Sequence, residues 1–159
     1  MKRELQAAND VVHTWLRAWV GEAPFEACCS HDVQYEDPLA HDPLRGIEAL
    51  EAHAARVHEA FPDLRIDRTG QALTGGDFLC IPWRAVGTHK NSTPALPATN
   101  RFVALHGLHY LELADGAVRR GRGFFDLYDA ATQLGILPTR GGIGESVLLL
   151  LRGFGIRSS

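Results

Sequence analysis

The sequence predicts an α+β fold in which a curved, mostly antiparallel sheet wraps around helices as a cone-shaped barrel with an internal pocket. One observation is the strong helical periodicity of residues 4–20 and of residues 46–61. The other is the change to strand-like patterns after residue 64, which implies a sheet packed on helices along one face. A long sheet that twists and curls leaves a hollow beside the first helix, and ligand pockets favour such places.

The composition is that of an ordinary globular protein. The 159 residues are 45% hydrophobic and 22% charged, which suits one domain with a sizeable core. We expect this domain to occupy residues 1–140 and an apolar tail to occupy residues 141–159. The net charge is −3 and only Arg119, Arg120 and Arg122 gather on one segment, so no nucleic-acid partner is expected.

The sequence also predicts a cytoplasmic location. The first residues lack the apolar stretch and cleavage site of a signal peptide, and the longest apolar run, residues 147–151, is too short to span a bilayer. The three cysteines, Cys28, Cys29 and Cys80, form neither a CxxC pair nor an even disulfide framework. A reducing compartment fits this usage best.

The first half of the chain is predicted to be mostly helical. Apolar residues recur at three- and four-residue steps over residues 4–20, which marks one buried helix face that includes Trp15 and Trp19. A short helix at residues 25–29 and a strand at residues 33–37 follow, and Pro38 ends the strand. A long helix begins at Gly46 and ends at Pro62. Its apolar face is predicted to hold Ile47, Leu50, Ala54, Val57 and Phe61, with His53 and His58 toward its other sides.

The second half is predicted to be a sheet followed by short helices. Strands are expected at residues 64–69, 78–88, 102–113 and 118–125, and the last three fit a meander. A helix at residues 127–134 ends at Gly135, the usual place for a C-terminal cap. Glycines at residues 141–144 are expected to form a hinge before an apolar helix at residues 147–151, with Phe154 and Ile156 beyond it.

Several short motifs together resemble one family. They are, in order, Tyr35-x-Asp37-Pro38, Gly46, Ala60-Phe61-Pro62-Asp63-Leu64, Gly87-Thr88-His89, Leu96-Pro97-Ala98-Thr99, Gly107-Leu108-His109, Asp115-Gly116, Asp126 and Gln133-Leu134-Gly135. Their order and spacing over residues 5–138 resemble the SnoaL-like polyketide cyclases of the nuclear transport factor 2-like superfamily, relatives of ketosteroid isomerases. The resemblance implies a cone-shaped fold, often a homodimer through the outer sheet face, and a site without cofactor or metal. Members differ widely in activity, so the site decides the function.

The resemblance also directs attention to His109 and Gly123. His109 matches the cavity histidine of the cyclases, and an imidazole there orients a carbonyl or transfers a proton. The alternative is a core histidine satisfied by a neighbour. Cyclases and epoxide hydrolases of the superfamily carry their catalytic aspartate where this sequence has Gly123, so the usual acid is missing. Gly121 and Gly123 are expected to widen the pocket, and Asp126 to cap the following helix.

Asp37 is the best remaining catalytic carboxylate. Residues 35–39 are similar to the segment on which ketosteroid isomerases carry their general base. At the mouth of an apolar cavity, desolvation is expected to raise the pKa of Asp37 toward what proton abstraction beside a carbonyl requires. The alternative is a turn aspartate beside proline. Steroid isomerisation is disfavoured, because Trp15 or Trp19 and Leu108 stand where the oxyanion donors of those isomerases would fall.

Other residues are candidates for contact with a ligand. Four aromatic side chains are expected to line the cavity or, alternatively, to fill the core: Trp15, Tyr35, Trp83 and Phe125. As a lining they suit a flat polycyclic or terpenoid ligand. Two histidines near strand ends, His41 and His89, are expected to rim the opening or to lie on the surface. No metal site is expected, because His106 and His109 point to opposite faces of a strand.

These residues leave three functional hypotheses. The first is a cofactor-independent isomerase or cyclase acting on a small hydrophobic carbonyl compound, polyketide- or terpenoid-like, with Asp37 as base and His109 as orienting donor or acid. The second is a protein that binds a hydrophobic molecule without chemistry, and the third is a cofactor-independent hydroxylase. Convergence of Asp37 and His109 on one point of the cavity would favour the enzyme. The tail is expected to pack on the domain or on a partner subunit, or alternatively to dock on a membrane surface.

Overall fold

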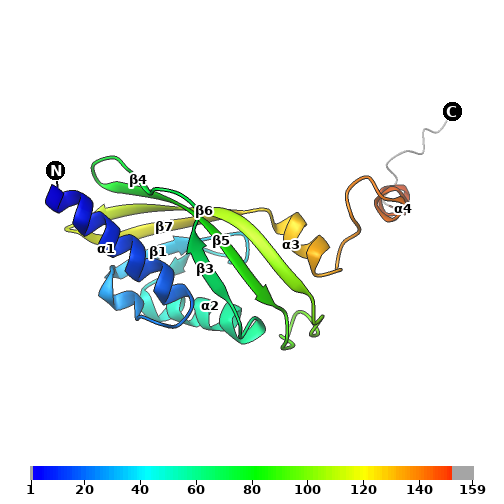
Figure 1. The fold of residues 1–159 in the computed structure, drawn as a ribbon. Helices are drawn as coiled ribbons and strands as arrows, with labels where there is room; N and C mark the ends of the chain where they lie inside the picture. The colour runs from blue at the N-terminus through cyan, green and yellow to red at the C-terminus, as the bar shows by residue number, and fades with distance from the viewer. Residues whose placement is uncertain (1, 152–159) are drawn as a thin grey trace.

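A computed structural model describes residues 2–151 as one curved sheet with helices beside it (Figure 1). The helices are α1 (Lys2–Trp19), the 3-10 turn η1 (Phe25–Ala27), α2 (Ile47–Ala60), α3 (Leu127–Gln133) and α4 (Ile143–Leu151). The strands are β1 (Cys29–Glu36), β2 (Leu44–Arg45), β3 (Arg65–Arg68), β4 (Leu73–Thr74), β5 (Phe78–Thr88), β6 (Phe102–Ala114) and β7 (Ala117–Phe125). The predicted α+β fold is confirmed.

The sheet follows the path β2-β1-β7-β6-β5-β3, with β4 paired to β5. Strands β5, β6 and β7 form the predicted antiparallel meander, whereas β1 lies parallel to β7. The path ends in two separate edges, so the sheet is open rather than closed into a barrel. Because β5 and β6 are long, with 11 and 13 residues, their twist curls the sheet around α1 and α2 (Figure 1).

The helices bury the faces that the periodicity predicts, with one correction. On α1 the buried side chains include Trp15 and Trp19. On α2 they include Leu50 and His53, although His53 was expected on another side of this helix. His53 follows Leu50 by three residues and precedes Val57 by four, which places all three side chains on one face. Spacing, and not polarity, therefore decides where this histidine points.

Several boundaries differ from the predictions. Strand β1 starts at Cys29 because Cys29 pairs with Val118 of β7, and the short helix before it shrinks to the single turn η1. The short strands β2 and β4 were not predicted. Asp126 caps α3 as expected, since its side chain accepts the backbone N–H of Asp129.

Helix α4 begins earlier than expected, so Gly144 of the predicted hinge lies inside it. It extends away from the sheet, and Ile143 and Leu151 are exposed (Figure 1). Its packing against a second subunit stays a prediction, and Phe154 and Ile156 lie outside the described residues. None of the helices described is long and apolar enough to cross a membrane.

An aromatic cluster joins α1 to the sheet. The ring of Trp15 lies 5.4 Å from that of Phe25 and 5.9 Å from that of Tyr35, measured between centroids. Trp19 lies 5.1 Å from Tyr35. Each of these four side chains is at most 5% exposed, and burying a large apolar side chain contributes roughly 1.5–3 kcal/mol. The cluster therefore anchors α1 against β1 and forms a firm wall behind the site.

Candidate functional site

A cavity of about 290 Å³ lies at the concave side of the sheet. Its wall is mostly aliphatic and aromatic and draws on α1, α2, α3 and the long strands. Among the described residues that line it, Tyr35, Asp37 and His109 alone carry ionisable side chains. The volume stands near the lower end of the roughly 300–1,000 Å³ typical of small-molecule sites. The site therefore suits a small apolar ligand that meets polar groups at one place.

The two glycines of β7 do not widen this cavity. A Cβ atom at Gly123 would clash with the hydroxyl of Tyr35 and stand 3.1 Å from the Asp37 Cβ. A Cβ atom at Gly121 would stand 3.0 Å from the Tyr35 ring and 3.1 Å from Trp15. The expectation of a wider pocket was wrong, because the aromatic side chains of β1 and α1 occupy the space that the glycines leave.

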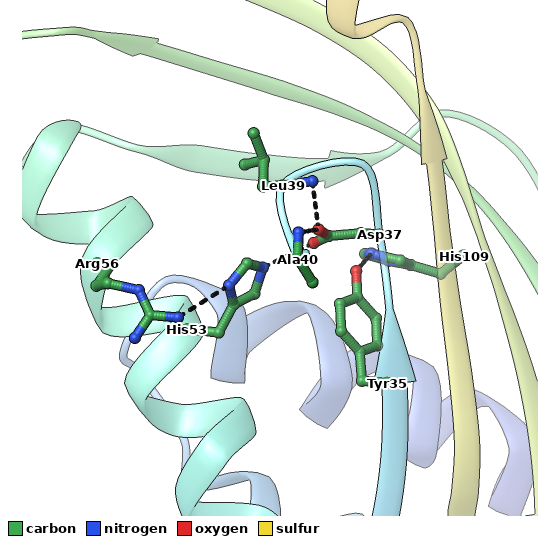
Figure 2. A network of polar contacts seen from close by, with 7 residues as sticks. All are labelled: Tyr35, Asp37, Leu39, Ala40, His53, Arg56 and His109. Carbon is green, nitrogen blue, oxygen red and sulfur yellow. Dashed lines mark hydrogen bonds and ion pairs between the residues drawn. The ribbon is translucent and has the colours of Figure 1, made fainter. Parts of the chain in front are cut away.

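Asp37 stands directly after β1, where the chain turns at Pro38 (Figure 2). Its Oδ1 accepts the backbone N–H groups of Leu39 at 2.8 Å and Ala40 at 2.9 Å. Its Oδ2 accepts a hydrogen bond from Nε2 of His53 at 2.8 Å. The side chain is only 4% exposed. Asp37 is thus both the turn aspartate of the alternative interpretation and a buried carboxylate in the cavity wall.

The pKa of Asp37 moves in the direction opposite to the prediction. Burial by itself raises this pKa, but the hydrogen bond from His53 and the N–H groups of Leu39 and Ala40 hold it below its ordinary value. The expectation that desolvation would raise it was therefore wrong. These donors lie beyond β1, with His53 on α2 and the two N–H groups in the turn after Asp37, and they favour the ionised carboxylate at neutral pH.

The orientation of the His53 imidazole, which donates to Asp37, is set by another residue of α2. Nη2 of Arg56 lies 3.4 Å from Nδ1 of His53 (Figure 2). An arginine side chain can only donate, so Nδ1 is the accepting nitrogen and Nε2 is the nitrogen that donates to Asp37. This role of His53 was not predicted from the sequence. Its spacing from Leu50 and Val57 was the signal that would have found it.

His109 lies on β6 and is 4% exposed. Nε1 of Trp15 donates to its Nδ1 at 3.1 Å, and its Nε2 lies 3.4 Å from the hydroxyl oxygen of Tyr35. Burial lowers the pKa of His109 to about 3, although the charge of Asp37 acts in the opposite direction. Trp19 stacks on the imidazole at a centroid distance of 5.6 Å, and Trp83 lies at 5.3 Å. The imidazole is therefore neutral at pH 7.

Tyr35 connects the other two ionisable residues of the cavity wall, Asp37 and His109. Its side chain reaches from β1 toward His109 and Asp37 (Figure 2). Burial, and after it the charge and hydrogen bonding of Asp37, raise the pKa of Tyr35 well above its ordinary value. The phenol therefore keeps its proton. From the sequence, Tyr35 was predicted only as an aromatic side chain that lines the cavity. The spacing of residues along a strand does not show where the hydroxyl group of a side chain lies in the folded protein.

The other candidate ligand contacts have different places. Trp83 and Phe125 line the cavity. Trp15 is not among the lining residues and instead donates a hydrogen bond to His109, while Trp19 of the same helix lines the cavity. His41 is exposed on the loop before β2. His89 is not at the rim: it is 2% exposed and its Nδ1 accepts the backbone N–H of Thr99 at 3.1 Å. It fastens the loop between β5 and β6.

The family model of the SnoaL-like polyketide cyclases matches residues 6–134. The chain belongs to this family. No curated protein matches the sequence of this SnoaL-like protein. Among the solved structures that share its fold, three have 18–20% sequence identity to it, a likeness that supports the fold alone.

The first of these structures is a candidate SnoaL-like polyketide cyclase from Jannaschia sp. CCS1, with 20% identity, a TM-score of 0.74 and coverage of 84% of this chain and 94% of the other. TsrD from Streptomyces laurentii has 20% identity, a TM-score of 0.73 and coverage of 83% and 97%. AclR from Streptomyces galilaeus, described as a candidate hydroxylase, has 18% identity, a TM-score of 0.68 and coverage of 96% and 94%.

Proposed function

We propose that this SnoaL-like protein is a cofactor-independent isomerase or cyclase that acts on a small, neutral, hydrophobic carbonyl compound by acid–base chemistry. One observation carries the proposal: Asp37, Tyr35 and His109, the ionisable residues of the cavity wall, gather in one polar network within an otherwise apolar wall. An ionised carboxylate beside neutral donors is the arrangement that enolisation of a ketone requires.

Asp37 is the base in this mechanism. Its carboxylate removes a proton from the carbon next to the substrate carbonyl, and the electron pair of the broken C–H bond moves onto the carbonyl oxygen. A hydrogen bond from the Tyr35 and His109 end of the network stabilises the resulting enolate. The enolate then takes the proton back from Asp37 at another carbon, which is isomerisation. Alternatively it attacks a second carbonyl of the same molecule, whose oxygen receives the electron pair of the C=O bond and takes the proton from Asp37, which is cyclisation. Neither outcome changes the oxidation level.

The lining also restricts the substrate. Among the described residues of the wall there is no lysine or arginine, and Asp37 is a carboxylate. A substrate group with a negative charge would therefore lose its hydration without gaining a cationic partner. The volume of about 290 Å³ favours a polyketide- or terpenoid-like compound of one or two rings over a large polycycle.

Binding without chemistry is the second candidate function. It is favoured by the fact that both oxygens of Asp37 already have protein partners, and by the lowered pKa, which makes this carboxylate a weak base. The two functions differ in one measurable respect. An enzyme of the proposed kind exchanges the protons next to a ketone with solvent, whereas a binding protein leaves them in place.

The test follows proton–deuterium exchange of 2-tetralone in D₂O by NMR. We expect the protein to accelerate exchange, and Asp37→Asn to lower the rate by roughly 10²–10⁴-fold while ketone binding is kept. Asp126→Asn is the matched control, because asparagine caps a helix as well as aspartate does. Binding of 2-tetralone with the same slow exchange in the wild type and in Asp37→Asn would support the binding protein instead. Uptake of O₂ on addition of an electron-rich aromatic would support a hydroxylase.

We also propose that the protein is a homodimer through the outer face of its sheet. Phe102 and Phe124 are 59% and 47% exposed, and strand alternation places them opposite the cavity. Large exposed aromatic side chains on one sheet face favour association with a second copy. Phe124→Glu should shift the molecular mass measured by light scattering toward that of a monomer, and a wild type that is already monomeric would refute the proposal.

A further inference from the structure

We propose that the hydrogen bonds from Trp15 through His109 to Tyr35 run in one direction only, so that Tyr35 is the catalytic donor to the substrate carbonyl and Trp15 and His109 are positioning residues. The catalytic part of this assignment rests on the proposed function. The direction of the hydrogen bonds does not, because it follows from the geometry of the protein alone. Figure 2 shows the contact between His109 and Tyr35.

The direction begins at Trp15. An indole N–H is a donor and never an acceptor, and Nε1 of Trp15 lies 3.1 Å from Nδ1 of His109. Nδ1 must therefore be the nitrogen without a proton. A neutral imidazole carries one proton, so it stands on Nε2. A charged imidazolium would bear a second proton on Nδ1, facing the indole N–H in a buried place without an acceptor.

The direction continues to Tyr35. Nε2–H of His109 faces the Tyr35 hydroxyl oxygen at 3.4 Å, so the phenol oxygen accepts there and its own proton is free to point elsewhere. Asp37 lies beside the hydroxyl, since the Tyr35 hydroxyl and the Asp37 Cβ both border Gly123, and its carboxylate is the acceptor for that proton when no ligand is bound. The missing side chain at Gly123 leaves the room in which the hydroxyl sits. A substrate carbonyl that enters beside Asp37 takes over this hydrogen bond.

The direction of these hydrogen bonds excludes His109 as the acid or base of the proposed reaction. Its Nδ1 is occupied by the indole of Trp15, and loss of the Nε2 proton would leave a buried imidazolate. During enolisation the carbon proton goes to Asp37 and the electron pair goes to the carbonyl oxygen, where the Tyr35 hydroxyl stabilises it. His109 acts through Tyr35, because its Nε2–H holds the phenol oxygen and leaves only the outward donor direction open.

The protein supplies a matched control for Trp15. Trp19 lies on the same helix and stacks on the same imidazole at a centroid distance of 5.6 Å, against 5.5 Å for Trp15. Among the described residues, however, its indole Nε1 has no hydrogen-bond partner. Trp19→Phe therefore removes an indole beside His109 without removing a hydrogen bond, whereas Trp15→Phe removes the donor that sets the direction.

The experiment is a two-bond ¹H–¹⁵N correlation spectrum of the full chain with ¹⁵N-labelled histidine, with His109 assigned by His109→Gln. We expect the Nε2–H tautomer in the wild type and in Trp19→Phe, unchanged from about pH 5 to pH 9. In Trp15→Phe we expect a fraction of the Nδ1–H tautomer. An Nδ1–H tautomer or a charged His109 in the wild type near pH 6 would overturn the proposal, and this spectrum decides even if Trp15→Phe does not fold.

The catalytic arm uses the exchange of 2-tetralone. Tyr35→Phe should lower kcat by roughly 10²–10³-fold with little change in KM, because it removes a donor that acts on the developing charge. If exchange needs Asp37 but not Tyr35, the assignment of Tyr35 is refuted while the proposed function stands. If the wild type does not catalyse exchange, the proposed function fails, and the tautomer spectrum still reports on the hydrogen-bond direction.

Discussion

The buried, neutral imidazole of His109 should make the protein lose stability in mild acid. The pKa of His109 is about 3 in the folded protein and 6.5 when it is free of these surroundings. Below pH 6.5 the unfolded chain binds a proton that the folded chain does not, so the free energy of unfolding falls by about 1.4 kcal/mol per pH unit until the folded pKa is reached. The loss at pH 5 relative to pH 8 is then about 2 kcal/mol.

Urea unfolding of the wild type and His109→Gln at both pH values measures this loss. Glutamine does not titrate, and its amide keeps a donor and an acceptor, so the comparison removes the contributions of the other histidines. The stability difference between the two proteins should shrink by about 2 kcal/mol from pH 8 to pH 5. A difference that stays constant to within about 0.5 kcal/mol would refute the argument, because it would mean that His109 is as easily protonated in the folded as in the unfolded chain.

Three further variants test the packing and polar contacts of the site by urea unfolding. Gly123→Ala should cost about 1–3 kcal/mol because the new Cβ displaces the phenol hydroxyl, whereas the control Gly70→Ala, whose Cβ meets its nearest atom at 3.5 Å, should change stability by less than about 0.5 kcal/mol; equal effects would contradict this packing. His53→Ala should cost about 1–3 kcal/mol at neutral pH by leaving the buried Asp37 carboxylate without its side-chain donor. This cost should shrink as the pH falls through the lowered pKa of Asp37, since the protonated carboxyl group no longer needs that donor; a cost independent of pH would argue against the pair. Gln133→Ala should cost about 1–3 kcal/mol, because the amide holds a backbone N–H of β6 at 2.8 Å and a backbone C=O at 2.9 Å; a neutral effect would show that α3 docks by apolar contact alone.

Much of the fold was accessible from local patterns. The helical faces that bury Trp15, Trp19 and Leu50 follow from spacing along the chain, and the meander of β5, β6 and β7 follows from alternation and turn residues. The short strands β2 and β4 were missed because two-residue strands carry no periodicity of their own. They exist only because a longer strand lies beside them.

The candidate site was accessible in part. Asp37 and His109 were selected from motifs, and the structure places both in the wall of one cavity. Tyr35 was expected only as an aromatic side chain that lines the cavity, and His53 was not expected to take part in the site. Their roles depend on where the end of a side chain lies in the folded protein: the Tyr35 hydroxyl occupies the space beside Gly123, and the His53 imidazole meets Asp37 from a different element.

The fold class, the family and the absence of the usual acid at Gly123 follow from residue types and their spacing along one chain. What replaces that acid depends on contacts between distant segments of the folded chain. In the folded protein, the Tyr35 hydroxyl lies in the space beside Gly123. His53 and two backbone N–H groups lower the pKa of Asp37, and His109 is buried in its neutral form with the Trp15 indole as donor to its Nδ1. Protonation and hydrogen-bond direction depend on distances of about 3 Å between groups from different elements, and only the folded chain sets those distances.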